Sequence, residues 1–323
     1  MNTTSGAEER DGVPLTNLDQ PLFDGAGATK RDLVEYLDGV RERILPVLED
    51  RPLSVIRVHR GQEAFMQKNV PKYTPPWVRT VRMWAESSNR DVSYALCNDR
   101  RTLLWFANQR AIEYHPALVR VDRPDRITHL VLDLDPPEAD AFPMAVRVAH
   151  AVRQALSDVG LTGAVKTSGA KGLHVFVPID DAASLEDAAA ATRAIAGRAE
   201  RLDPEIATTA FVKAERGGKV FVDSTRVGGA TVIATYSPRV RPGVPVSFPV
   251  AWEDLDAITP ADFTVHTALR QLDDRDPWLE HMQDPQRLPP DLIEEGHAIP
   301  VARVQAMHEG KRRARAARDM AKD

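Results

Sequence analysis

The residues best suited to chemistry in this 323-residue chain begin with a pair of aspartates. Asp133 and Asp135 end the apolar run ITHLVLDLDPP, which has the composition of a β-strand. Because side chains alternate across a strand, the two carboxylates are expected to share one face. Carboxylates this close resist joint ionisation unless a cation lies between them, and hard divalent ions prefer such oxygen ligands. The pair therefore predicts a Mg²⁺ or Mn²⁺ site at a strand end.

The segment VKTSGAKGLHVFVP, which follows further along the chain, carries groups that an anionic substrate would need. Ser168 offers a hydroxyl, Lys171 a cation, and His174 an imidazole at the start of a new strand. The glycines of the SGAKG turn allow backbone N–H groups to approach a ligand. Candidate binders of metal and of phosphate thus lie close together in the sequence.

A third carboxylate, Asp223, ends the short apolar strand KVFVD. A strand-terminal aspartate from a distant part of the chain is what a site for two cations would require. Basic residues flank this strand on both sides in the sequence: Lys213, Arg216, Lys219, Arg226, Arg239 and Arg241.

Composition limits the classes of protein to consider. With 43% hydrophobic residues and a formal net charge of −5, the chain can bury a substantial core but has no overall attraction for nucleic acid. A polyanionic partner must therefore meet a local basic patch. One cysteine, Cys97, excludes an intrachain disulfide and fits a reducing compartment. No apolar run reaches the roughly 18 residues of a membrane span, so a cytoplasmic protein without a membrane partner is expected.

The remaining patterns predict the elements that position these groups. Thr29 has the character of a helix N-cap, and helices are also predicted from Asp99, over 142–159, from Ser184 to Leu202, and at about 288–296. Strands are predicted at 53–58, at 78–84 paired with 92–96, and at 112–118, the last carrying His115. The proline-broken segment FMQKNVPKYTPPW is expected to be a loop.

Basic and aromatic residues interleave between Arg57 and Arg82, an arrangement that would suit a nucleic-acid groove. An ordinary solvated surface with a few buried aromatics explains the same mixture, and is the more common case.

The runs LDLDPP, KTSGAKGLHVFVP and KVFVD resemble the three motifs of the archaeo-eukaryotic primase superfamily, and most closely those of the polymerase domain of bacterial DNA ligase D. The resemblance continues through LTNLDQPLF, FMQKN, PPWVRTV, TYSPRVRPG and DPW, from about residue 14 to 280. It implies an α+β, archaeo-eukaryotic primase-like fold, with two antiparallel or mixed β-sheets around a central catalytic cleft flanked by helices.

The expected organisation is one primase-polymerase domain over 14–300. An N-terminal module of about 14–125 would pack on a catalytic core of about 126–280. The polar residues 1–13 are expected to be mobile, and 301–323 to form a basic tail. The chain is too short to hold the nuclease-like and ligase modules of full ligase D, so it resembles a stand-alone polymerase.

The resemblance also implies a function. The chain would be a template-directed nucleotidyltransferase that adds nucleotides, with rNTPs preferred over dNTPs, to a primer 3′-hydroxyl. Its DNA would be gapped, nicked or 3′-overhang ends with a 5′-phosphate, in repair by non-homologous end joining. Ku and a separate DNA ligase would be partners, and the protein would be associated with the nucleoid.

Specific residues take roles by this resemblance. Asp133, Asp135 and Asp223 would be catalytic and would hold two Mn²⁺ or Mg²⁺ ions. The implied nucleotide-binding residues are Ser168, Lys171, His174, His115, Arg216, Arg239 and Arg57. The implied DNA-binding residues are Gln20, Lys30, Phe65, Met66 and Lys68.

Two of these positions depart from the family pattern. Met66 stands where the family commonly has a second phenylalanine, which weakens one stacking platform for a template base. Gln20 stands where a lysine is usual, so one cation for a 5′-phosphate is missing, and weaker discrimination of phosphorylated ends is expected.

Two other function classes fit part of the pattern. A metal-dependent glycosyltransferase also uses Asp-x-Asp, but that class explains neither Asp223 nor the SGAKGLH run. A noncatalytic nucleic-acid-binding module is the other, and the intact set of three aspartates speaks against it.

Overall fold

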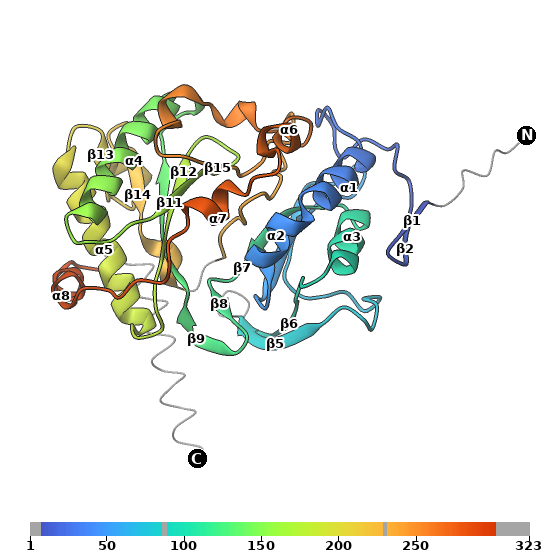
Figure 1. The fold of residues 1–323 in the computed structure, drawn as a ribbon, viewed down its shortest axis with the longest axis horizontal. Coiled ribbons are helices and arrows are strands. Elements are labelled where there is room, and N and C mark those ends of the chain that lie inside the picture. The colour runs from blue at the N-terminus through green and yellow to red at the C-terminus, as the bar shows by residue number, and fades with distance from the viewer. Residues whose placement is uncertain (1–7, 86–88, 229–230, 302–323) are drawn as a thin grey trace, which may run out of the picture.

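Two β-sheets with helices around them dominate the computed structural model, which describes residues 8–85, 89–228 and 231–301 (Figure 1). The predicted α+β class is therefore confirmed. No helix within these ranges has the length and apolarity needed to cross a bilayer.

The N-terminal half contains a five-stranded sheet. Its strands run in the order β4-β3-β6-β5, with β7 paired to β3. The strands are β3 (Leu53–Arg57), β4 (Phe65–Gln67), β5 (Thr80–Ala85), β6 (Arg90–Ala95) and β7 (Ala111–Pro116). The accompanying helices are α1 (Lys30–Gly39), α2 (Arg41–Leu48) and α3 (Arg100–Asn108).

Local signals account for these helices. Thr29 caps α1 in a capping box with Asp32, and Asp99 accepts a hydrogen bond from the Thr102 amide at the start of α3. The segment at Phe65 was expected to be a loop, which is wrong for its first three residues. Phe65–Gln67 pairs antiparallel with β3, a strand too short for its pattern to show in the sequence.

Regular structure begins at Glu8, inside the segment 1–13 that was expected to be mobile. The strands β1 (Glu8–Arg10) and β2 (Val13–Leu15) form a hairpin, and Val13 and Leu15 are buried. Residues 1–7, and all of the expected basic tail except its first residue, Val301, lie outside the described residues.

The second sheet has six strands in the order β13-β14-β10-β12-β11-β15, antiparallel except between β13 and β14. These strands are β10 (His129–Asp135), β11 (Ala164–Thr167), β12 (Leu173–Pro178), β13 (Ala207–Thr208), β14 (Val220–Asp223) and β15 (Pro249–Val250). A small hairpin, β8 (Val119–Arg120) with β9 (Arg123–Ile127), links the two halves of the chain.

Helices α4 (Phe142–Ser157) and α5 (Leu185–Leu202) pack beside this sheet (Figure 1). Ser184 caps α5 as predicted. The remaining α-helices are α6 (Ala268–Leu272), α7 (Pro277–His281) and α8 (Pro290–Ala298), with short 3₁₀ turns between the elements. The helix predicted at 288–296 corresponds to α8.

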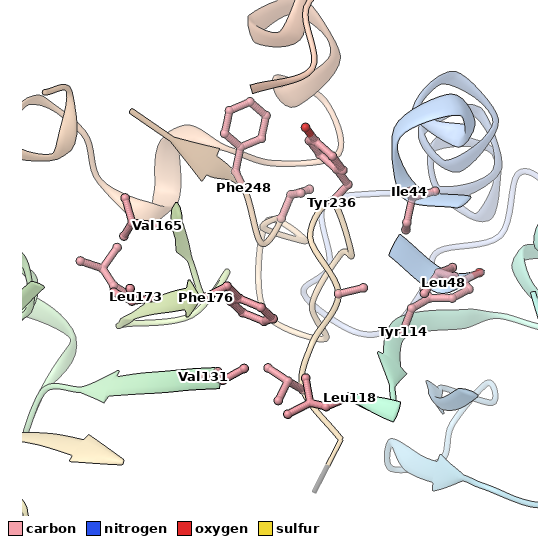
Figure 2. Close-up of a cluster of buried hydrophobic side chains, with 14 of the residues drawn as sticks. Ile44, Leu48, Tyr114, Leu118, Val131, Val165, Leu173, Phe176, Tyr236 and Phe248 are labelled. Carbon is pink, nitrogen blue, oxygen red and sulfur yellow. The ribbon is translucent and has the colours of Figure 1, made fainter. Parts of the chain in front are cut away.

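One hydrophobic cluster runs through both halves of the protein. Figure 2 shows Leu48 and Tyr114 from the first half, and Val131, Phe176 and Tyr236 from the second, as members of this shared core. The tyrosines carry polar atoms into it, and the Tyr36 hydroxyl donates to the Tyr236 carbonyl at 2.8 Å. The two sheets are therefore fixed relative to each other by a common core.

The contact between α5 and α8 gives a test of this packing. A β-carbon at Gly296 would collide with the Ala190 carbonyl oxygen, whereas one at Gly197 would meet only ordinary contacts at 3.5 Å. We expect Gly296→Ala to destabilise the fold by roughly 1 to 3 kcal/mol, because backbone atoms must move. Gly197→Ala should stabilise α5 by about 0.5 to 1 kcal/mol. Urea unfolding of both variants measures the difference, and an unchanged midpoint for Gly296→Ala would contradict this packing.

Candidate active site

The three predicted aspartates meet on neighbouring strands of the six-stranded sheet. Strand β10 lies between β12 and β14, and Asp133 is directly opposite His174 on one side and Asp223 on the other. Residues directly opposite in antiparallel strands share a face. Asp135, two residues along β10, lies on that face as well. The sheet register thus brings together four of the residues expected from the sequence.

Asp133 and Asp223 are joined by a guanidinium group. Arg226, in the 3₁₀ turn Thr225–Gly228, donates to Asp133 Oδ2 at 2.8 Å, and its Nε lies 3.3 Å from Asp223 Oδ2. Asp223 also accepts hydrogen bonds from the Thr225 amide and hydroxyl, at 2.8 and 2.6 Å. Arg226 was noted only as one of several basic residues in the sequence, and its position between two carboxylates depends on the fold.

These contacts set the charge of Asp133. Burial alone would raise the pKa of this carboxyl, but His174 and Arg226 outweigh it and hold the pKa below its ordinary value. Burial, aided by the charge of Lys166, lowers the pKa of His174 to about 4. Asp133 is therefore an ionised carboxylate at neutral pH.

Asp135 has its own cations. Lys171 Nζ lies 3.0 Å from Oδ1, and Arg216 Nη1 lies 3.3 Å from Oδ2. The Arg216 guanidinium also stacks on Phe221, 3.9 Å from the ring centroid, which holds the arginine in place. Two of the expected nucleotide-binding residues therefore contact an aspartate that was expected to be catalytic.

The SGAKG turn is fixed by glycine and by its own serine. The Ser168 hydroxyl accepts hydrogen bonds from the amides of Ala170 and Gly172, both at 3.2 Å. Gly169 has φ +68°, and a β-carbon at Gly172 would collide with the Leu134 carbonyl oxygen. Gly172 therefore lets the turn approach the end of β10, and Gly169 supplies its left-handed backbone.

A residue that the sequence analysis did not select, Glu113, connects two that it did. Glu113 Oε2 is 2.9 Å from His115 Nε2, and Glu113 Oε1 is 3.1 Å from Arg239 Nε. Glu113 Oε1 also accepts from the Val240 amide at 2.9 Å, and Arg239 Nη1 donates to the Ser168 carbonyl at 2.7 Å. Glu113 therefore ties β7 of the first sheet to the SGAKG turn of the second.

Burial would raise the pKa of Glu113, but the His115 hydrogen bond and the Arg239 charge lower it to about 2. The spacing of Glu113 and His115, two apart on one strand, places both on one face. That spacing was visible in the sequence, but the partner Arg239, more than a hundred residues away, was not.

Arg57 lies in a different cluster from the other predicted nucleotide-binding residues. It is buried and donates to Gln67 Oε1 at 2.6 Å, the Gln109 carbonyl at 2.8 Å and the Tyr73 hydroxyl at 3.1 Å. Its guanidinium also lies 5.8 Å from the centre of the Phe65 ring. Arg57 thus supports the side chains around β4.

The predicted stacking residues lie on β4, which is an edge strand of the first sheet, and they face solvent. Phe65 is 37% exposed and Met66 is 46% exposed. The Phe65 ring lies 5.1 Å from that of His59. Lys68 follows β4 directly and is half-buried. Exposed apolar side chains beside basic groups form a surface on which nucleobases can stack.

Lys30 is the first residue of α1, and Gln20 lies in the segment before that helix, where its carbonyl accepts from the Lys30 amide at 2.9 Å. Lys30 is buried, and its ammonium donates to the Thr16 carbonyl at 2.5 Å and to Asn108 Oδ1 at 2.6 Å. Burial, with the charge of Arg110, lowers the Lys30 pKa to about 8. Gln20 Oε1 accepts from Arg110 Nη1 at 3.3 Å. Gln20 and Arg110 line a cavity of about 580 Å³ together with His59 and Arg60.

The three aspartates present carboxylate oxygens on one face of the sheet. Within 8–85, 89–228 and 231–301, no three acidic, histidine or cysteine side chains converge closely enough to form a metal cluster in this structure. The positively charged Arg226 contacts Asp133 and Asp223, which marks the space between them as favourable to a cation. The carboxylate oxygens suit Mg²⁺ or Mn²⁺.

Comparison with known proteins identifies the family of this chain. Residues 29–278 match the family described as "LigD, primase-polymerase domain". The chain is 36% identical over 263 residues to the multifunctional non-homologous end joining DNA repair protein LigD of Mycobacterium tuberculosis H37Rv, covering 78% of this chain and 34% of that protein. It is 32% identical over 283 residues to the bifunctional LigD of Bacillus subtilis 168, covering 86% of this chain and 45% of that one.

Among solved structures, the polymerase domain of Mycobacterium tuberculosis ligase D in complex with DNA superposes with a TM-score of 0.77 at 34% identity. The match covers 85% of this chain and 98% of that one. The chain spans about a third to just under half of the curated relatives it matches. On the extent of these matches, the chain belongs to the LigD primase-polymerase domain family and is a polymerase of the nucleotidyltransferase class.

Proposed function

We propose that this protein extends a DNA primer by template-directed nucleotide addition, with ribonucleotides preferred, at gaps, nicks and 3′-overhang ends. The observation that carries the proposal is the sheet register that places Asp133, Asp223 and His174 side by side, with Asp135 on the same face. Neither an Asp-x-Asp glycosyltransferase nor a noncatalytic binding module accounts for this set together with the family match.

The aspartates would hold two Mg²⁺ or Mn²⁺ ions, which when bound would favour ionisation of the primer 3′-hydroxyl and neutralise charge on the triphosphate. The chain itself supplies the ligands and fixes them on rigid strands. In the reaction the 3′-oxygen forms a bond to the α-phosphorus, and the bond from that phosphorus to the pyrophosphate oxygen breaks.

The basic residues around the aspartates would bind the triphosphate. Lys171 belongs to the SGAKG turn and lies beside Asp135, and Arg239 donates to the Ser168 carbonyl of the same turn. Positioned cations of this kind stabilise charge on a transferring phosphoryl group. Glu113 would orient Arg239 and His115 for the nucleotide.

The surface around β4 would contact the template. Phe65 offers a ring for a nucleobase, while Met66 offers apolar area without a flat face. Lys68 would add a cation for the backbone, since phosphate contacts dominate affinity for nucleic acid.

End joining would be the setting, because the curated relatives are named for non-homologous end joining. We propose Ku and a separate DNA ligase as partners of this chain. The test of the function is one gel assay with primed gapped DNA, unprimed single strands and paired 3′-overhang ends, each with rNTPs and with dNTPs. Extension of primed ends, greater with rNTPs, is expected. Failure to extend any of these substrates would refute the proposal.

The aspartates give the first specific prediction of this function. Asp133→Asn or Asp223→Asn removes a ligand charge worth several kcal/mol in the transition state, so primer extension should fall by at least about a hundredfold. DNA affinity should change little, because the carboxylates serve the ions. The matched control is Asp140→Asn, an exposed aspartate on the segment that follows β10. Near-normal extension in both site variants would exclude this assignment.

Glu113 gives a second prediction. Glu113→Gln keeps an acceptor for the Val240 amide but loses the charge that holds His115 and Arg239. Hydrogen bonds to charged groups contribute roughly 1.5 to 3 kcal/mol, so the efficiency of nucleotide use should fall by about ten- to a hundredfold. The loss should appear mainly as a higher KM for the nucleotide. Steady-state kinetics on a primed template measures it, with the exposed Glu138→Gln as control.

An acid titration checks the same contacts without activity. The Glu113 pKa is about 2 in the fold against 4.5 ordinarily, so its stabilisation is present above pH 4.5 and is lost as the pH falls towards 2. Glu113→Gln should lack that part of the decline in unfolding free energy between pH 4.5 and 2. Identical acid profiles for the two proteins would contradict the ion pairs.

Recognition of a 5′-phosphate gives a further prediction. The Gln20 side chain is uncharged, and the cation that contacts it is Arg110, which donates a hydrogen bond to Gln20 Oε1. We expect Arg110→Ala to reduce the preference for a phosphorylated gap and Gln20→Lys to increase it. The Gln20→Lys effect should be a few-fold to tenfold, since a charged donor exceeds a neutral one by roughly 1 kcal/mol.

Fluorescence anisotropy at fixed salt would compare gapped duplexes with and without the 5′-phosphate. Lys219→Ala is the control. Lys219 precedes β14 of the six-stranded sheet, and its ammonium donates to the Pro204 carbonyl. If neither Arg110→Ala nor Gln20→Lys alters the preference, the phosphate is bound elsewhere.

A further inference from the structure

Lys166 is a buried lysine beside the proposed active site for which neither the sequence motifs nor the proposed mechanism supplies a role. It lies on β11 directly opposite His174 of β12, and its side chain is fully buried, with 0% exposure. The register continues to Asp133 on β10 and Asp223 on β14. Four polar side chains thus form one row across four adjacent strands, and Lys166 is the interior end of that row.

The ammonium nitrogen has three polar neighbours. It lies 2.5 Å from Ser247 Oγ, 3.1 Å from the Ile233 carbonyl oxygen and 3.0 Å from His174 Nδ1. The Ser247 hydroxyl donates its proton to the Thr167 carbonyl at 2.8 Å, so it can only accept from Lys166. The Ile233 carbonyl also accepts. Two N–H groups of Lys166 are therefore used by these oxygens.

The third contact determines how His174 presents its ring. Nδ1 faces Lys166, so Nε2 faces Asp133 Oδ1, at 3.3 Å. A neutral ring with its proton on Nδ1 would turn the Nε2 lone pair towards a carboxylate, which is repulsive. An ammonium whose other two N–H groups are on oxygens donates its third N–H to Nδ1, so Nδ1 is the acceptor nitrogen of the ring. The ring proton is then on Nε2 and points at Asp133.

We propose that Lys166 is a positioning residue that acts through His174: it holds Nδ1 from the interior and so fixes an Nε2–H donor against Asp133. The relevance of this to catalysis rests on the proposed function, since Asp133 is there a ligand for the cations. The hydrogen bond to Oδ1 orients the carboxylate and leaves Oδ2, now on Arg226, directed at the space between Asp133 and Asp223. Outer partners of this kind orient ligands in metal sites.

Nitrogen NMR tests the hydrogen bonds without using activity. In protein labelled with ¹⁵N-histidine, long-range ¹H–¹⁵N correlations report which ring nitrogen carries a proton, and the signals of His174 are those lost in His174→Gln. We expect a protonated Nε2 in the wild-type protein. A wild-type ring with Nε2 unprotonated overturns the proposal, whatever the variants do.

Lys166→Met replaces the ammonium by an apolar side chain of similar length. It should shift the Nδ1 resonance of His174, whereas Ser247→Ala, which removes another neighbour of the same ammonium, should leave that resonance in place. An Nδ1 resonance that does not move in Lys166→Met overturns the proposal. Thermal melting of both variants shows that the comparison is made on folded protein.

Kinetics then separates positioning from a general effect on the fold. Loss of an outer partner of a ligand costs about ten- to a hundredfold in activity, so Lys166→Met should lower the rate of nucleotide insertion by about that factor. Because Lys166 acts through His174, adding Lys166→Met to His174→Gln should cost less than about twofold more. Multiplicative losses in the double variant would overturn the positioning role. If the NMR results hold but no variant or wild-type protein extends DNA, the proposed function fails and the hydrogen-bond assignment stands.

Discussion

The need to neutralise three carboxylates on one face of a buried sheet constrains the rest of this site. Asp133, Asp135 and Asp223 are held together by strand register, and like charges at this spacing are unfavourable without compensation. The compensating cations are Arg226, Arg216 and Lys171, each within 3.3 Å of a carboxylate oxygen. Lys171 follows β11, while Arg216 precedes β14 and Arg226 follows it, so the charge balance ties the segments next to these two strands to the end of β10.

A second constraint links the two sheets. Glu113 belongs to the first sheet but is buried against Arg239, which lies in the segment between β14 and β15 of the second sheet. A buried ion pair is costly to desolvate and needs good geometry to persist. Here the geometry is supplied by the common hydrophobic core that holds both sheets, part of which is drawn in Figure 2. The common core therefore fixes the position of Arg239, which we propose binds the triphosphate.

The sequence predicted those features of the fold and the site that depend on local patterns. The Asp133 and Asp135 strand, the SGAKG turn and the capped helices at Thr29 and Ser184 are all short-range features, and the structure has them. What it could not predict depends on register and on pairing over long distances. Glu113 with Arg239, and Arg226 between two aspartates, require knowledge of which strands are neighbours. Lys30 was expected to contact DNA, and the assignment stays a proposal; its burial and its bond to Asn108 follow from packing between α1 and α3.

The pairing of cations with aspartates also indicates how charge would be balanced when divalent ions and a triphosphate bind. If divalent ions take the carboxylates, Arg226, Arg216 and Lys171 lose the partners that they have in this structure. An incoming triphosphate carries the negative charge that these groups would then need, and Arg and Lys bind phosphate oxygens well. His174 differs from them, because Lys166 holds it from the interior and it is neutral at pH 7, so it has no charge to transfer. The site thus combines three cations that can exchange partners with one neutral donor that stays in place, and this division follows from which side chains reach the sheet from loops and which belong to its strands.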